Sequence, residues 1–482
     1  MTTAPDLMTL LTDRVRRGGL NRWMQQVESA GRCARPVRLI GQSTTIASKT
    51  GEILSSYGSS SEPDGITYTR CGNRRASVCP SCSDEYKGDM WHLLVAGATG
   101  GSKGVPAAIR QHPLVFATLT APSFGLVHAS KKPGRPGSRR CRPRSRAALC
   151  RHGRATWCMA THDDHDPLAG QPLCAECYDY PGHVLWQWWA PMLWRVFTIC
   201  LHRQVADYLG IDRDQLANLI RIQFAKVAEY QRRGIIHFHF LVRLDGPATS
   251  CDPFPAPPPG ITAQRLCDLV RAAAAAASYT TPADPVTGPV RLAFGTQVDA
   301  RPVHDTATRD DTAGQDLHPE TVAAYIAKYA TKATDDLEAG QRPVNPHLRR
   351  VRQTVDVLAD RVDRRDPDSP YRRLSACRAS LGFRGHFATK SRGYSTTLTE
   401  LRRARHAWRT RSTRPLRTAL ADGQVVTRIG DDPANPGDVD DESTLVIKTW
   451  QYAGRGWATD GDTALAAQSA ALALEHRHHR RP

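Results

Sequence analysis

The sequence predicts a mixed α/β fold in which helices flank a central antiparallel sheet. An apolar, β-rich run begins after Pro113 and is typical of a core strand. Residues 220–246 contain two strand-like segments joined by a tight turn at 231–234, which is a hairpin signature and therefore indicates an antiparallel pair. Residues 183–210 and 319–336 have helical spacing and supply helices that can pack on the sheet.

The remaining elements are less prominent. They are, in chain order, a short amphipathic helix within 1–19, a Pro-rich linker at 252–260, a helix at 265–277, a strand within 290–303, a strand at 445–450 and a helix at 464–474. The helix at 319–336 has Pro319 in its first turn and Asp316 as a possible cap. The tryptophans of 183–210 are expected in the core rather than stacked on bases.

We expect three domains, because a chain of 482 residues is longer than one hydrophobic core usually organises. Residues 1–110 form a Cys-bearing N-terminal region. Residues 111–340 hold the sheet, with a Cys/His-rich insertion at about 131–183. Residues 341–482 form a basic C-terminal region that is expected to be irregular until 441.

Charge is the most informative property of the composition. Lys and Arg total 65 against 47 acidic residues, which gives a net charge of +18 and indicates a polyanionic partner. The mean hydropathy is −0.45, and we find neither an apolar run that could span a bilayer nor a signal peptide. We therefore expect a soluble, cytoplasmic protein.

A pair of histidines on the second strand of the hairpin is a candidate metal site. Side chains alternate along a strand, so His237 and His239 share one face while Phe238 and Phe240 share the other. Glu229 on the preceding strand can lie beside the pair. Two imidazoles and one carboxylate leave open positions for water and phosphate. The alternative is two histidines in a half-buried strand.

The helix at 319–336 carries candidate nucleophiles. Tyr325 and Tyr329 are four residues apart and lie on one face, and Lys328 and Lys332 each follow a tyrosine by three. A phenolate can attack a phosphodiester, and a nearby ammonium can stabilise the phenolate or the phosphate. The alternative is an ordinary amphipathic helix with core tyrosines.

Thirteen cysteines in an intracellular chain indicate metal binding more than disulfides. Two groups are candidate structural zinc sites. The first group is Cys33, Cys71, Cys79 and Cys82, and the second is Cys150, Cys158, Cys174 and Cys177. With further Cys and His residues, the insertion has enough potential ligands for two ions. The spacing does not show which ligands would bind which ion. The alternative is buried thiols.

Two basic tracts are candidate DNA contacts, at 131–146 and 401–418. Such contacts bind phosphates with little dependence on sequence. The arginines concerned are Arg139, Arg140, Arg402, Arg403, Arg405 and Arg409. A solvated charged face is the equal alternative.

Three segments together resemble the motifs of the HUH endonucleases. They are FATLTAP (116–122), GIIHFHFLVRLDG (234–246) and AAYIAKYATKATD (323–335), in that order. The chain is similar over roughly residues 30–400 to the replication initiators of actinobacterial rolling-circle plasmids and integrative elements. The resemblance implies an HUH-type sheet of five strands and a zinc-bound N-terminal module.

The resemblance also implies an activity. A tyrosine nicks and rejoins one strand of origin DNA through a 5′-phosphotyrosine, using Mg²⁺ or Mn²⁺, with single-stranded DNA at the nick and a host helicase and polymerase as partners. By the same likeness Tyr329 is the first nucleophile and Tyr325 the second or an auxiliary.

Three alternatives remain open at this point. An HUH transposase shares the motif order. A relaxase is disfavoured, because its tyrosine usually precedes the histidine motif. The third is a non-enzymatic, zinc-stabilised DNA-binding regulator in which the histidines and tyrosines are structural.

Overall fold

A computed structural model describes residues 6–130, 140–143, 148–163, 166–283, 288–303, 317–331, 345–365, 368–412 and 444–479. The chain forms two compact units. The central unit spans Lys87–Leu398, and the terminal unit combines Met1–Tyr86 with Thr399–Pro482. Within the described residues, no helix is both long enough and apolar enough to cross a membrane.

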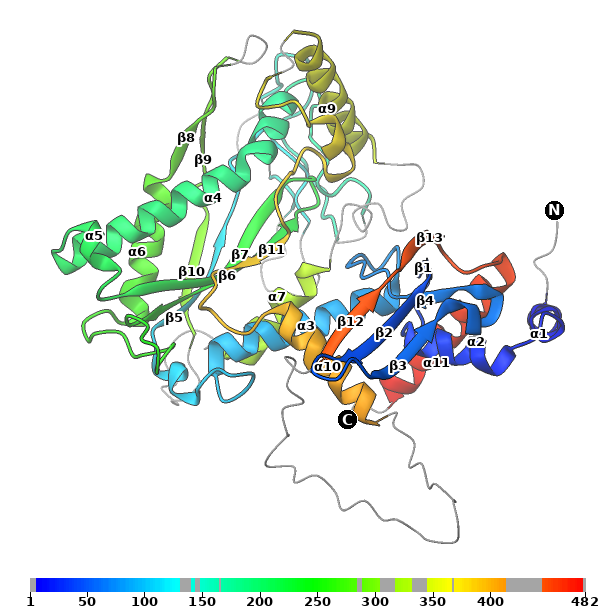
Figure 1. The fold of residues 1–482 in the computed structure, drawn as a ribbon. Coiled ribbons are helices and arrows are strands. Elements are labelled where there is room, and N and C mark those ends of the chain that lie inside the picture. The colour runs from blue at the N-terminus through cyan, green and yellow to red at the C-terminus, as the bar shows by residue number, and fades with distance from the viewer. Residues whose placement is uncertain are drawn as a thin grey trace, which may run out of the picture. The chain divides into compact units, whose positions relative to one another are not determined.

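The central unit is built on one antiparallel sheet with the strand order β10-β5-β7-β6-β11 (Figure 1). Its strands are β5 (Leu114–Leu119), β6 (Arg221–Tyr230), β7 (Ile236–Asp245), β10 (Val298–Pro302) and β11 (Ala388–Lys390). A separate pair is formed by β8 (Ser278–Thr280) and β9 (Arg291–Ala293). The expected mixed fold with a central antiparallel sheet is therefore confirmed, and so is the hairpin.

Helices complete the central unit. In chain order they are α3 (Pro80–Thr99), which begins in the terminal unit, η3 (Ala107–Gln111), α4 (Tyr180–Leu209), α5 (Arg213–Leu216), α6 (Ala263–Ala276), α7 (Pro319–Ala330), α9 (Pro346–Arg365) and η4 (Ser375–Ser380). Pro319 lies in the first turn of α7, as expected, whereas Asp316 lies outside the described residues.

One face of the sheet is the hydrophobic core, and α4 packs on it. Trp194 contacts the rings of Phe238 and Phe240, with centroids 5.5 and 4.9 Å apart. Trp186 and Trp188 are also buried in this core. The prediction that these tryptophans are core residues is confirmed. Because strand neighbours alternate, the histidines must then face the other side of the sheet.

The terminal unit contains two small sheets, β13-β1-β4 and β12-β2-β3. Its elements are α1 (Leu7–Arg16), α2 (Leu20–Ser29), β1 (Val37–Ile40), β2 (Gln42–Ala47), β3 (Ile53–Gly58), η1 (Ser59–Ser61), η2 (Pro63–Gly65), β4 (Thr67–Thr69), α10 (Leu398–Ser412), β12 (Thr444–Lys448), β13 (Gln451–Arg455) and α11 (Asp460–His479). A small core around Trp23 and Trp457 holds the helices to the first sheet.

The division into units differs from the three expected domains in sequence. Strand β13 pairs with β1 and β12 pairs with β2, so the C-terminal segment completes sheets that the N-terminal segment begins. The described residues between 345 and 412 are also less irregular than expected. Helix α9 buries Leu348, Val351 and Val355 at helical spacing despite its many arginines.

Candidate functional site

Glu229, His237 and His239 converge on the face of the β6–β7 hairpin that lies opposite the hydrophobic core. Glu229 pairs directly with His237 across the two strands, and His239 follows on the same face. One carboxylate oxygen, Oε2 of Glu229, lies 2.9 Å from Nε2 of each histidine. The structure thus brings together the three side chains that the sequence singled out.

The spacing of these atoms fits one shared metal ion. Ligand atoms that lie at right angles, each about 2.1 Å from an octahedral ion, are about 3.0 Å apart. The Nδ1 atom of His239 lies 2.9 Å from the hydroxyl of Thr118 on β5. With the proton on Nδ1, His239 donates to that hydroxyl, and its Nε2 lone pair is free for a cation. The donor set suits a divalent ion with open coordination positions.

Helix α7 brings both tyrosines to this site. The ring of Tyr329 stacks on His239 with centroids 5.4 Å apart, and the ring of Tyr325 meets His239 edge-on at 5.3 Å. The two phenol rings are 4.6 Å apart. Phe116 of β5 packs against Tyr325, with centroids 5.9 Å apart, and closes the cluster on one side.

The charge around Tyr325 opposes ionisation. Burial raises the pKa of the Tyr325 phenol, and the carboxylates of Glu229 and Asp299 raise it further, while a hydrogen bond from Tyr329 lowers it. Lys328 lies between the two tyrosines in the sequence, and its side chain is exposed. Lys332 lies outside the described residues. A divalent cation held by the Glu-His-His group would offset the carboxylate charge and favour a phenolate here.

The four N-terminal cysteines form one compact group. Their sulfur atoms lie 3.7 Å apart in each of three pairs, which join Cys33 to Cys79, Cys33 to Cys82 and Cys71 to Cys82. Sulfurs that bind one tetrahedral zinc ion at about 2.3 Å are about 3.8 Å apart. Hydrogen bonds from the neighbouring thiols lower the pKa of Cys79. The arrangement fits a Cys₄ zinc site.

The potential metal ligands of the insertion form a different group from the one that the sequence predicted. Cys150, Cys174 and Cys177 lie together, and the fourth member of their group is His152 rather than Cys158. Sγ of Cys177 is 3.2 Å and Sγ of Cys174 is 3.6 Å from Nδ1 of His152. A backbone bridge pairs Cys158 with Arg142, away from the turn that carries Cys150 and His152, which is why Cys158 joins other residues.

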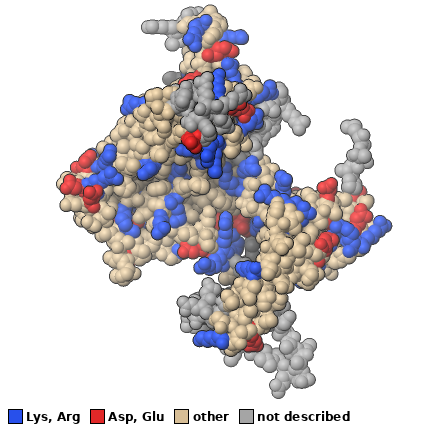
Figure 2. Space-filling view, turned by 45° about the horizontal axis from the view of Figure 1, so that its top comes forward, with Lys and Arg blue, Asp and Glu red and all other residues tan. Residues whose placement is uncertain are grey.

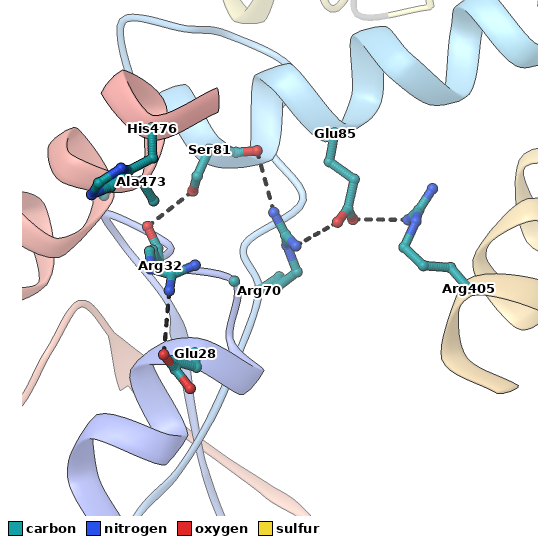
Figure 3. Close-up of a pocket in the computed structure, with 10 residues that line it drawn as sticks. Glu28, Arg32, Arg70, Ser81, Glu85, Arg405, Ala473 and His476 are labelled. Atoms are coloured by element: carbon teal, nitrogen blue, oxygen red, sulfur yellow. Dashed lines mark hydrogen bonds and ion pairs between the residues drawn. The ribbon is translucent and has the colours of Figure 1, made fainter. Parts of the chain in front are cut away.

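The candidate DNA contacts have different environments. Arg402 and Arg403 are exposed on α10, whereas Arg405 pairs with Glu85 at 2.9 Å. Figure 3 shows Arg70 directed at the same carboxylate, beside a cavity of about 600 Å³. Arg405 is thus engaged within the terminal unit.

The other basic candidates add little to that picture. Arg140 is exposed, while Arg139 and the side chain of Arg409 lie outside the described part of the chain. Figure 2 shows Lys and Arg spread over the face in view, with acidic side chains in smaller patches.

Two residues of the site were not singled out by the sequence. Thr118 lies within the FATLTAP segment, and its strand position places it on the histidine face, so alternation could have found it. Gln231 lies in the hairpin turn, and its amide nitrogen is 3.3 Å from Nδ1 of His237. No spacing rule marks a turn residue of this kind.

Comparison with known proteins identifies the family. A family model described as the replication initiator protein of pSAM2, RepSA, matches residues 19–471. A replication initiator protein from Streptomyces ambofaciens is 40% identical over 461 residues, which cover 92% of this chain and 89% of that protein. No solved structure matches the chain significantly. The chain belongs to the RepSA family of replication initiator proteins.

Proposed function

We propose that the central unit is an HUH-type nicking domain that cuts and rejoins one strand of DNA at the origin of a plasmid or integrative element. The observation that carries the proposal is the convergence of two phenols on a Glu-His-His group. Family membership supports initiation over transposition or conjugative transfer.

The reaction is a transesterification at phosphorus. The phenol oxygen of Tyr329 forms a bond to the scissile phosphorus as the P–O3′ bond breaks. The phenol gives up its proton and the departing O3′ gains one, so a 3′ hydroxyl and a 5′-phosphotyrosine result. Because the tyrosyl ester retains the energy of the phosphodiester, the reverse attack rejoins the strand without ATP. Tyr325, on the same helix face, supplies the second attack.

Glu229, His237 and His239 hold the divalent cation in this proposal. Mg²⁺ or Mn²⁺ bound there would polarise a non-bridging phosphate oxygen and offset the carboxylate charge that raises the pKa of Tyr325. Stacking on His239 fixes the phenol of Tyr329 beside the bound phosphate. Lys328 stabilises charge at the phosphate from the same helix, and Lys332 is assigned the same role in this proposal.

Binding of origin DNA is assigned to the basic surfaces. Arg402 and Arg403, exposed on α10, are candidates for phosphate contacts. Arg139, Arg140 and Arg409 belong to the same proposal. Zinc in the Cys-rich groups is structural. A host helicase unwinds the duplex, and a host polymerase extends the free 3′ end.

The test is a covalent adduct. The full chain is incubated with Mn²⁺ and single-stranded oligonucleotides that tile both strands of the encoding replicon, then denatured and separated by size. We expect a protein–DNA adduct with one oligonucleotide, and chelator should abolish it. Changing both Tyr325→Phe and Tyr329→Phe should lower the yield at least about 10³-fold, because the nucleophile is removed.

Tyr452→Phe is the matched control, because Tyr452 is exposed on β13 of the terminal unit. It should leave the adduct unchanged. The single variants separate the two roles: Tyr329→Phe should block the first cleavage, and Tyr325→Phe should allow cleavage while impairing strand transfer. Adduct formation that survives in the double variant would refute the assignment.

A further inference from the structure

A fourth group of potential ligands lies in the insertion, and it includes a histidine that precedes the Cys-rich segment. The group is His128, Cys141, Cys158 and His162. Nε2 of His162 lies 3.0 Å from Nδ1 of His128 and 3.3 Å from Sγ of Cys158. Sγ of Cys141 is 3.9 Å from Nδ1 of His128.

These separations match a tetrahedral zinc ion. With Zn–S near 2.3 Å and Zn–N near 2.05 Å, sulfur and nitrogen ligands lie about 3.5 Å apart and two nitrogens about 3.3 Å apart. Two thiolates and two imidazoles are a donor set typical of structural zinc. One backbone amide, that of Ala129, donates to Sγ of Cys141 at 3.2 Å and helps to fix the position of this sulfur.

Ordinary hydrogen bonds account poorly for the same contacts. An imidazole nitrogen offers either one proton or one lone pair. Nε2 of His162 nevertheless faces both Nδ1 of His128 and Sγ of Cys158. Its other nitrogen, Nδ1, is already taken by Asp166 at 2.6 Å. A cation shared by all the ligand atoms removes this conflict.

Asp166 is the expected outer partner of a metal-bound histidine. A carboxylate on Nδ1 fixes the proton there and leaves Nε2 as the ligand atom. The backbone amide of Leu168 also donates to Asp166, at 2.8 Å, which orients the carboxylate. The geometry points to a zinc site at His128, Cys141, Cys158 and His162, separate from the Cys150 group.

The position of this site suggests what the zinc does. The carbonyl oxygen of His128 accepts a hydrogen bond from the amide of Gly170 at 2.8 Å. Gly170 packs so closely on the β6–β7 turn that a Cβ there would lie 2.6 Å from the carbonyl carbon of Arg232. The next strand begins at Ile236 and carries His237.

The zinc ion therefore clamps the insertion against the turn that leads into the histidine strand. Two further contacts hold the same turn: His347 of α9 contacts the carbonyl oxygen of Arg233 at 2.9 Å, and Gln187 of α4 donates to the carbonyl oxygen of Gly234 at 3.1 Å. Neither the zinc site nor the clamp depends on the proposed nicking function.

The first test counts zinc in the purified full chain by elemental analysis. The parent carries His237→Ala and His239→Ala, so that the sheet site contributes no metal. We expect the parent to hold three zinc ions, one for each Cys-containing group. Adding Cys141→Ser and Cys158→Ser should lower the count to two. A folded variant that still holds three would overturn the site.

The control is Cys377→Ser, which changes a half-buried thiol outside the four ligand groups found among the described residues and should leave three ions. Asp166→Asn covers the case in which the double variant fails to fold. It keeps all four ligands but loses the carboxylate, so zinc affinity measured by chelator competition should fall about 10- to 100-fold. Unchanged affinity would contradict the role of Asp166 as an outer partner.

The clamp has its own readout, hydrogen exchange of the backbone amides at 231–236. Exchange there should become faster in the Cys141→Ser, Cys158→Ser chain and stay unchanged in Cys377→Ser. Loss of zinc without faster exchange would overturn the clamp. Neither zinc content nor exchange requires strand cleavage, so a failure of the proposed nicking activity would remain distinguishable.

Discussion

The ligands of the sheet site and those of the insertion are held in place by different kinds of structure. Glu229, His237 and His239 lie on two long paired strands whose opposite face is the hydrophobic core. The ligands of the insertion lie on loops joined by isolated bridges, such as those between Val127 and Pro172 and between Arg142 and Cys158. The sheet can therefore build its site before a metal arrives, whereas the loops depend on the metal for their arrangement.

The same reasoning applies to the Cys₄ group of the terminal unit, and it predicts that zinc removal weakens that unit more than the central sheet. Cys79→Ser removes a buried ligand of the Cys₄ group, and the loss of zinc should lower the stability of the terminal unit by at least about 3 kcal/mol, because binding energy there is folding energy. Limited proteolysis and thermal unfolding measure the effect. The same loss should follow from a strong chelator.

Cys267→Ala is the matched control in the central unit. Cys267 is fully buried in α6, and none of the ligand groups found among the described residues includes it. Replacing Cys267 should lower stability only through the lost packing contacts, and chelator should not lower the stability further. Equal chelator sensitivity of the core strands and of the Cys-rich segments would break the comparison.

The two faces of the sheet can be compared through Lys226, which is buried on the core face. Its ammonium lies 4.4 Å from the centroid of Phe238, and burial lowers its pKa from 10.5 to about 7. The unfolded chain therefore binds a proton that the folded chain lacks between these two pH values, so stability should rise with pH in that window. Burial of Lys226 lowers the stability of the fold most below pH 7, where its amine is charged in both the folded and the unfolded chain.

Lys226→Met should therefore stabilise the chain most at low pH. Between pH 6 and pH 9 the gain should shrink by about 2 to 3 kcal/mol, which corresponds to about two pKa units. Denaturant unfolding at the two pH values measures it. Lys87→Met, at an exposed position on α3, should show no such dependence. A gain independent of pH would show that Lys226 is hydrated in the folded chain.

Sequence patterns predicted the sheet site well because its geometry is local. Alternation along β7 placed His237 and His239 on one face, and the four-residue spacing on α7 placed the two tyrosines together. The approach of α7 to the sheet came only from the resemblance of motifs. That approach is a tertiary contact, and no local period encodes it.

The insertion and the terminal unit were predicted less well for the same reason. His128 precedes the segment that the cysteines marked, and it reaches Cys158 only because the chain folds back. The pairing of β12 with β2 joins segments almost 400 residues apart, and neither strand carries a sign of its partner. Helix α9 was missed because its arginines hid the spacing of Leu348 and Val351.

The smallest expected effect tests how far the sheet alone prepares its site. Thr118→Val keeps the size and strand preference of the side chain but removes the hydroxyl that lies 2.9 Å from Nδ1 of His239. Without that acceptor the proton of the imidazole is no longer held on Nδ1, and Nε2 is less often available to a cation. Outer partners of this kind contribute 10- to 100-fold to metal affinity in other sites, and we expect about tenfold here, because the paired strands already fix the ring.

Thr120→Val is the control, since Thr120 directly follows β5 and donates to the carbonyl oxygen of Gln297 instead. Mn²⁺ titration by calorimetry should show weaker binding for Thr118→Val alone, with unfolding unchanged in both variants. If Thr118→Val binds Mn²⁺ as tightly as the parent, the strands by themselves orient His239. If it loses binding altogether, the sheet site depends on a single side-chain contact as much as the loops depend on zinc.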